Sequence, residues 1–239
     1  MKLYGCFLFL LLQSCIQGSI GTDIGIRENY RSYIPARTAV LSCVSLESPT
    51  NLISEKQRAE FCKSVDLNVL SSFDDQKFMQ GYTPSAVESV LKKKKRIDLL
   101  KNLISMLSSD FSKCSDCINF SQFYEKNIRT KIEWESLLLE FSKNVFYSDA
   151  ILIPIIVSVK EEHVDDRGLL LSTRHIDLEL LLIDTQKGDL IWNSKKTSSL
   201  SEKKLRSPEK YPPYPEWASV INNLLTESLW REYPGKIFL

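Results

Sequence analysis

Four cysteines in the body of the chain are the residues best suited to chemistry. Cys114 and Cys117 form a C-x-x-C pair, and Cys43 and Cys62 lie far upstream. Such a pair can hold a low-pKa thiolate for disulfide exchange, a role that normally needs a strand before it and a helix after it. In an oxidising compartment the four residues form up to two structural disulfides, and three pairings are open. We favour a structural bridge, with disulfide exchange and free thiols as alternatives. A zinc site made of four thiolates usually has two pairs of cysteines close together in the sequence, and here there is one such pair.

The two histidines offer little further chemistry. His163 lies in the acidic segment 161–166, which is able to bind a cation but reads better as solvated charge in a hairpin loop. His175 lies beside Asp177 on the polar face of an expected strand, where we expect a cross-strand partner. The sequence contains no glycine-rich phosphate loop, no G-x-S-x-G and no H-E-x-x-H. We therefore expect no enzyme activity, no metal and no cofactor.

The first fifteen residues differ from the rest of the chain. Lys2 is the only charge before Asp23, and Leu3 to Leu12 is an apolar run of the length of a signal-peptide core. It ends at Leu12-Gln13-Ser14-Cys15, which resembles, in a loose form, the lipobox of bacterial lipoproteins. The resemblance implies that residues 1–14 are removed as a signal peptide and that Cys15 is acylated. An ordinary signal peptide, with Cys15 a bystander, is the alternative.

The membrane is the first partner that this interpretation implies. Several acyl chains exceed the two hydrophobic signals that stable anchoring takes, and no later run approaches the roughly 18 apolar residues of a spanning helix. Ile16 stands where an inner-membrane retention signal has Asp, so the resemblance favours the outer membrane of a cell envelope. The whole chain has 31 basic and 30 acidic residues, and its removed segment holds one of the basic ones. A neutral body has no field that attracts nucleic acid.

The stretch from Ile151 to Trp192 predicts the centre of the fold. Its first apolar run, rich in β-branched residues, suits a strand covered on both faces. The next run alternates, the period of a half-buried strand, with Ile176, Leu178, Leu180 and Leu182 on one face and His175, Asp177 and Glu179 on the other, polar face. Residues 184–189 then reverse the chain, with Gly188 free to take a positive φ.

The other elements complete one domain over residues 38–239, preceded by a lipidated cysteine and tether over 15–37. We expect a strand at 39–44 and helices over about 54–73, 83–107, 134–145 and 215–233, with residues 108–129 polar and irregular. The predicted fold class is α/β (α+β): a two-layer mixed sheet, with an antiparallel hairpin at 151–195 and amphipathic helices on one face.

Two local patterns have a functional and an ordinary interpretation. Residues 92–96 are five consecutive cations, able to touch anionic head groups, but helical neighbours point all round the axis and so read as a solvated face. Residues 194–215 form a basic, Ser- and Pro-rich connection whose Tyr-Pro-Pro-Tyr-Pro at 211–215 either docks in an aromatic groove or packs a loop on its own domain.

The turn after the second strand resembles a hairpin found in a group of bacterial lipoproteins. Ile183-Asp184-Thr185, Gly188 and Leu190-Ile191-Trp192 match that hairpin, in which Asp184 caps the turn and Trp192 returns onto the helices. The group includes the curli secretion channel subunit, the penicillin-binding-protein activator and the Pel polysaccharide exporter. Its domain is similar to the N-terminal domain of TolB. An uncharacterised lipoprotein family of spirochaetes and myxobacteria is the nearest fit.

Three functions follow from these observations. The first is a lipid-anchored, non-enzymatic envelope protein that binds another envelope protein or assembles with copies of itself. The second, which the resemblance implies, is a subunit of an envelope secretion or export complex; the amphipathic β segments of pore-forming members are not evident here. The third is a thiol–disulfide active protein that works through Cys114 and Cys117.

Overall fold

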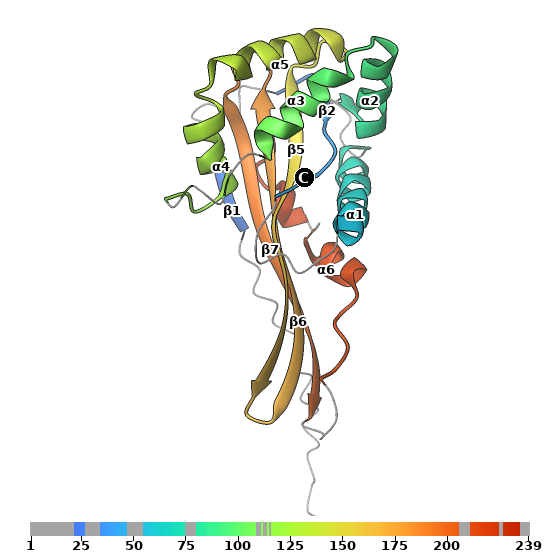
Figure 1. Ribbon diagram of the computed structural model, residues 1–239, viewed down its shortest axis with the longest axis vertical. Coiled ribbons are helices and arrows are strands. Elements are labelled where there is room, and N and C mark those ends of the chain that lie inside the picture. Colours follow the sequence, from blue (N-terminus) through green and yellow to red (C-terminus); the bar gives the residue numbers. More distant parts are fainter. Residues whose placement is uncertain are drawn as a thin grey trace, which may run out of the picture.

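Three long antiparallel strands form the centre of the fold. They are β5 (Ala150–Asp166), β6 (Leu169–Asp184) and β7 (Leu190–Leu205), and they run in one meander along the length of the molecule (Figure 1). The computed structural model describes residues 22–26, 34–46, 55–74, 80–108, 111, 114, 116–205, 211–224 and 227–234. The ladder between β5 and β6 extends from the pair Ala150–Asp184 to the pair Asp166–Leu169, with a bulge between Ile156 and Ser158.

Shorter strands extend this meander into a seven-stranded mixed sheet within the described ranges. The order is β1-β7-β6-β5-β2-β4, and β3 pairs with β5 beyond β2. β1 (Thr22–Ile26) is antiparallel to β7, whereas β2 (Arg37–Val40), β3 (Val44–Ser45) and β4 (Gln80–Tyr82) join through parallel pairs. The expected mixed α/β class is confirmed.

One helix lies between β3 and β4, most of the others lie between β4 and β5, and the last two follow β7. They are α1 (Glu55–Asp74), α2 (Pro84–Lys93), α3 (Ile97–Leu107), α4 (Phe120–Phe123), the π-helical turn η3 (Tyr124–Ile128), α5 (Ile132–Asn144), α6 (Trp217–Leu224) and the 3₁₀ turn η4 (Glu227–Trp230).

Helices cover both faces of the sheet, so the expectation that they share one face of a two-layer fold is wrong. Ile151 and Ile153 of β5 pack in a core with α2, α3, α4 and α5. Leu152, between them, packs in a second core with α1 and α6. The reason is that successive side chains of a strand point to opposite faces, and β5 is apolar and buried at every position from 150 to 156. An all-apolar strand needs a cover on each side.

The single helix expected over 83–107 is two helices with a turn between them. Thr83 caps α2 by accepting a hydrogen bond from the Ala86 N–H at 3.1 Å. The chain then turns at Lys95, which has a positive φ of 58°, and the Arg96 N–H donates to the Leu91 carbonyl at 2.8 Å. Lys92 to Lys95 are exposed, as a solvated run of cations should be.

Three segments form regular structure that the sequence did not predict. Residues 22–26, expected to be tether, form β1, because the edge of β7 supplies backbone partners for a segment with little pattern of its own. Residues 120–128, expected to be irregular, form α4 and η3 and bury Phe120 and Tyr124. Residues 194–205, expected to be a connection, continue β7, whose Ser and Thr residues suit a pleated, half-polar surface.

The turn between β6 and β7 has the geometry that its residues suggest. The Asp184 carboxylate accepts a hydrogen bond from the Gln186 N–H at 2.9 Å, and Gly188 has a φ of +69°. The Tyr124 hydroxyl donates to the Gly188 carbonyl at 2.5 Å and accepts from the Trp134 indole N–H at 2.8 Å. This chain of bonds ties η3 and α5 to the turn. On the opposite face, Trp192 is fully buried against Trp230 and Tyr233.

Replacing Gly188 by Ala tests this packing. A Cβ on Gly188 would lie 3.1 Å from Trp134 Cδ1 and 3.3 Å from Leu138 Cδ1, in addition to the strain of the positive φ. We expect Gly188→Ala to lower the free energy of unfolding by about 2–4 kcal/mol in urea titrations. Gly168→Ala is the matched control, since Gly168 also has a positive φ but no atom within 4 Å of its Cβ position, and strain alone costs about 1 kcal/mol. Equal losses in the two variants would contradict the packing described.

Candidate functional site

The four cysteines of the body form two disulfides. Cys43 is bonded to Cys62, with their Cα atoms 5.0 Å apart, and joins the segment before β3 to α1. Cys114 is bonded to Cys117 within a single loop. The sequence allowed three pairings of these four cysteines, and the structure has the one that joins cysteines close to each other along the chain. Cys15, the expected lipidation site, lies outside the described residues.

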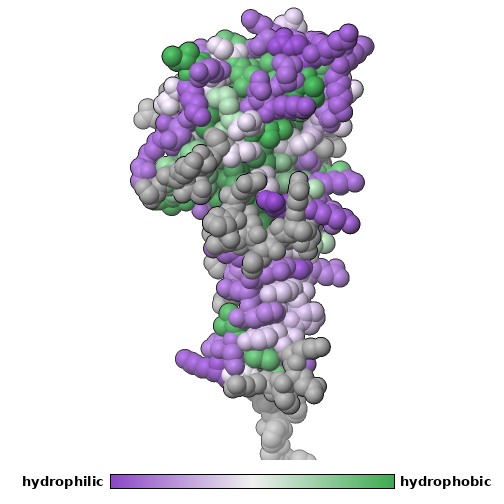
Figure 2. All heavy atoms as spheres, in the orientation of Figure 1, coloured by the Kyte–Doolittle hydropathy of each residue, from purple (hydrophilic) through white to green (hydrophobic). Residues whose placement is uncertain are grey.

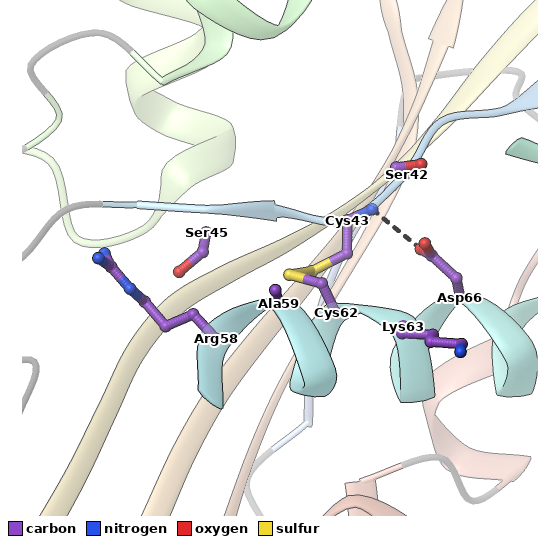
Figure 3. Close-up of a pocket in the computed structure, with 8 residues that line it drawn as sticks. All are labelled: Ser42, Cys43, Ser45, Arg58, Ala59, Cys62, Lys63 and Asp66. Carbon is purple, nitrogen blue, oxygen red and sulfur yellow. Dashed lines mark hydrogen bonds between the residues drawn. A yellow bond between two sulfur atoms is a disulfide. The ribbon is translucent and has the colours of Figure 1, made fainter. Parts of the chain in front are cut away.

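A recess opens where the Cys43–Cys62 disulfide meets the surface. It has a volume of about 490 Å³ and lies between α1 and the edge of the sheet at β3 (Figure 3). We call it the disulfide recess. Its lining consists of Ser42, Cys43, Ser45, Arg58, Ala59, Cys62, Lys63 and Asp66.

Asp66 is the electrostatically unusual group of the recess. Its Oδ1 accepts a hydrogen bond from the Cys43 N–H at 2.9 Å, so the carboxylate caps the edge of the sheet from the helix (Figure 3). Burial raises the pKa of Asp66 to about 6, against a smaller lowering by that hydrogen bond. The Asp66 carboxyl therefore stays mostly ionised near pH 7 and becomes neutral only as the pH falls below about 6.

The other polar groups of the recess are two cations and two serine hydroxyls. Arg58 and Lys63 contribute two cations, and Ser42 is exposed. The hydroxyl of Ser45 is buried and has no hydrogen-bond partner among the described residues. β3 pairs with β5 on one side, and no described strand pairs with its other side. A sheet edge beside two cations suits an extended polypeptide segment that carries carboxylates.

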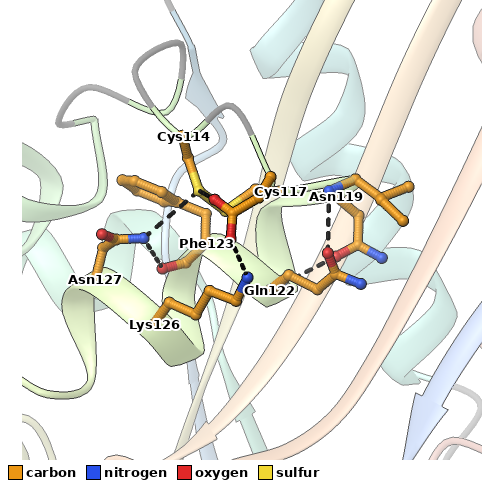
Figure 4. A network of polar contacts seen from close by, with 9 residues as sticks. Cys114, Cys117, Asn119, Gln122, Phe123, Lys126 and Asn127 are labelled. Carbon is orange, nitrogen blue, oxygen red and sulfur yellow. Dashed lines mark hydrogen bonds and ion pairs between the residues drawn. A yellow bond between two sulfur atoms is a disulfide. The ribbon is translucent and has the colours of Figure 1, made fainter.

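Cys114 and Cys117 lie in a separate polar network before α4 (Figure 4). The Cys114 Sγ is 3.3 Å from Asp116 Oδ1 and 3.8 Å from Asn127 Nδ2. Asp116 in turn pairs with Lys126 at 2.7 Å, which lowers the pKa of that carboxyl. An anion this close to the sulfur opposes thiolate formation. Cys114, Asp116 and Cys117 place three potential ligand atoms within 4.8 Å of one another, but the two sulfurs are bonded to each other.

The histidines take part in contacts between side chains. His163 stacks between Tyr211 and Tyr214, with ring centroids 4.4 and 4.6 Å away, and its Nδ1 is 2.9 Å from the Ser172 hydroxyl. His175 pairs across strands with Glu162 at 2.8 Å. His175 therefore has a cross-strand partner, as expected from the sequence, and that partner is Glu162.

The stacked tyrosines belong to the Tyr-Pro-Pro-Tyr-Pro run, which packs on its own domain. We call residues 211–215 the strap. The Ser172 hydroxyl donates to the Pro212 carbonyl at 2.5 Å, and Arg174 donates to the Pro215 carbonyl at 2.6 Å. The Arg174 guanidinium also lies 4.1 Å from the centroid of Trp217. The strap therefore ties α6 to the far part of the meander.

Glu179 is a buried polar residue that sequence reasoning placed on the solvent face of β6. It is fully buried and accepts hydrogen bonds from the N–H groups of Phe120 and Ser121 at 2.8 and 2.9 Å. Burial raises the pKa of its carboxyl, while these bonds oppose the rise. The carboxylate thus satisfies the first amides of α4. The alternating pattern of the sequence predicted the place of Glu179 in the strand, but it did not predict that α4 covers this residue.

Comparisons with known proteins give weak structural similarity. No family model and no curated sequence matches the chain. Lipoprotein GNA1162 from Neisseria meningitidis is 11% identical over 73% of this chain and 88% of its own, with a TM-score of 0.34. The PelC dodecamer from Paraburkholderia phytofirmans (9%, covering 89% and 94%, TM-score 0.37) and hypothetical protein CT253 from Chlamydia trachomatis (10%, covering 83% and 95%, TM-score 0.36) are similar to the same degree. The structural neighbours thus include a bacterial lipoprotein. Within the described ranges, every helix is too short or too polar to cross a bilayer.

Replacing Asp66 by Asn tests the electrostatics of the disulfide recess. The folded-state pKa of about 6 exceeds the ordinary value of 3.8, so protonated Asp66 favours the folded state; this contribution is full below pH 3.8 and is lost as the pH rises through 6. Between pH 4 and pH 7, we expect the wild type to lose about 1–2 kcal/mol of unfolding free energy relative to Asp66→Asn, a value reduced because the carboxyl keeps some solvent contact. Urea titrations at the two pH values measure the difference. Parallel changes in both proteins would show that Asp66 is not desolvated.

Proposed function

We propose that this chain is a lipid-anchored bacterial envelope protein with a non-enzymatic role, binding another protein at the disulfide recess. One observation carries the anchoring: a short apolar run that ends at Leu12-Gln13-Ser14-Cys15. Acylation of Cys15 would hold residues 15–239 at a membrane surface.

The disulfides support placement outside the cytosol. Such bonds persist in oxidising compartments and are rare where glutathione and thioredoxin keep thiols reduced. Cys43–Cys62 and Cys114–Cys117 both fit that environment. The outer membrane is the finer assignment, and it rests on Ile16 following the cysteine.

The disulfide recess supports the binding role. It combines an edge strand, the cations Arg58 and Lys63, and a buried hydroxyl of Ser45 without a described partner. A partner segment that adds to the β3 edge would supply the backbone hydrogen bonds, and its carboxylates would face the two cations. We therefore infer an acidic, extended segment of an envelope protein as the ligand.

Two other functions stay predictions. A secretion or export complex would be one setting for the same recess. Thiol–disulfide exchange at Cys114 and Cys117 has a physical argument against it, since Asp116 lies beside the Cys114 sulfur and disfavours its thiolate.

Mass spectrometry and photo-crosslinking test the proposal. We expect the N-terminal peptide of the mature protein to begin at an acylated Cys15, and a photoreactive residue at Ser42 to crosslink to one specific envelope protein. Ser85, also exposed on α2, is the matched control position and should give no specific product.

The double change Arg58→Glu and Lys63→Glu should reduce the Ser42 product at least about tenfold, as loss of two charge-assisted contacts implies. Lys93→Glu with Lys101→Glu, both at exposed positions, should leave it unchanged. An unmodified residue 15 would reject the anchor, and equal products at Ser42 and Ser85 would reject the recess.

A further inference from the structure

The meander extends well beyond the strands that flank it. β3 pairs with β5 only at Ile155 and Ile156, and β1 pairs with β7 only as far as Lys196. We call the remainder the arm: residues 158–166, 169–177 and 197–205 of the three long strands. Figure 1 shows these strands continuing past the helices as a narrow extension, away from α5.

One face of the arm ends in four aliphatic side chains. The register pairs Val164 with Leu171 and Leu169 with Leu205, and paired residues of antiparallel strands project to the same face. Leu205 is 77% exposed and Val164 is 38% exposed, whereas Leu169 and Leu171 are half-buried. We call these four residues the tip patch. Figure 2 shows hydrophobic side chains among hydrophilic ones near the far end of the arm.

The tip patch and the strap lie on opposite faces of the arm. Ser172 and Arg174, which bind the strap, alternate along β6 with Leu171 and Thr173. No described segment of the chain packs over the tip patch as the strap packs over the other face. The charged residues on the face of the tip patch are of both signs: Glu162, Asp166 and Lys203, with Arg167 in the adjoining turn. A surface with aliphatic residues and balanced charge has no strong preference for anionic over neutral lipid head groups.

The orientation of β1 puts its first residue on the side of the arm. β1 is antiparallel to β7, with Ile26 opposite Trp192 and Thr22 opposite Lys196, so Thr22 is the end of β1 nearest the arm. Cys15 is seven residues earlier and can reach at most about 25 Å from Thr22, at ~3.6 Å per residue. The nine residues from Lys196 to Leu205 span roughly 30 Å at ~3.3 Å per residue. Seven residues are therefore long enough for an acylated Cys15 to reach most of the way along the arm.

We infer that the arm stands on the lipid bilayer, with the tip patch inserted among the phospholipid head groups and the outer part of the acyl chains. This rests on the proposed function, because the acylated Cys15 supplies the first attachment. The tip patch supplies a second, apolar contact that the anchor brings close to the bilayer at high effective concentration. The contact fixes the orientation of the body, holding α5 and the disulfide recess away from the lipid.

Depth-dependent fluorescence quenching tests the inference. Leu205→Trp and Ile132→Trp each replace an exposed aliphatic residue, at the tip and at the start of α5 respectively. The full-length lipidated proteins are reconstituted in dioleoylphosphatidylcholine vesicles with or without brominated phosphatidylcholine. We expect the added tryptophan at 205 to be quenched roughly twofold by the bromines, since an interfacial side chain lies about 5–10 Å into the head-group region. The tryptophan at 132 should match the wild-type background, and 20% phosphatidylglycerol should change neither result.

The outcomes separate this inference from the proposed function. Vesicles that float with the protein bound, but leave the tryptophan at 205 unquenched, would overturn the arm contact and keep the anchor. A blue shift at 205 without quenching, together with a doubled mass in sedimentation, would show that a second copy covers the tip patch and would also overturn it. Failure to float, with residue 15 unmodified, would remove the anchor and this inference together. Unchanged circular dichroism of both variants confirms that they are folded.

Discussion

The hydrogen-bonded ladder of the β5–β6–β7 meander is the constraint on which the rest of the structure depends. β6 lies between two neighbours over its whole length, and its partners in register run from Leu169 to Asp184. Because side chains alternate between the two faces, this one ladder determines which residues enter which core. The apolar half is covered by helices on both sides, whereas the polar half is covered on one face by α6 and the strap. The division into a body and an arm follows from the change in composition along the same three strands.

Buried polar contacts attach the covering elements to the ladder. Glu179 satisfies the first amides of α4, and the Trp134–Tyr124–Gly188 chain joins α5 and η3 to the turn at the end of β6. On the other face, Arg174 and Ser172 bind the strap. Each contact pairs a backbone group that would otherwise be buried without a hydrogen bond. Removing such a contact therefore destabilises the fold by more free energy than the hydrogen bond contributes on balance. They therefore fix where each element sits, while the apolar cores supply most of the stability.

The sequence predicted the features that depend on local pattern and missed those that depend on partners far along the chain. The apolar run at 151–156, the alternation at 175–182 and the turn with Gly188 are all readable from a few neighbouring residues. β1 and α4 have weak patterns of their own and form because β7 and Glu179 offer hydrogen-bond partners. The disulfide recess was beyond prediction for a related reason, since its parts meet only when Cys43 pairs with Cys62 and not with another cysteine. Residues 194–205 of β7 mix polar and apolar side chains, and this composition fits a loop as well as a strand.

The inferred bilayer contact requires that the arm is a rigid continuation of the body. An arm with that property can hold the tip patch against a bilayer and the disulfide recess toward a partner. Hydrogen exchange on the intact protein measures it most directly. We predict that the amides of residues 170–176 in β6, paired on both sides, exchange at least about 100-fold more slowly than in an unstructured peptide of the same sequence. Exchange of these amides at the unstructured rate, with residues 178–183 still protected, would contradict it.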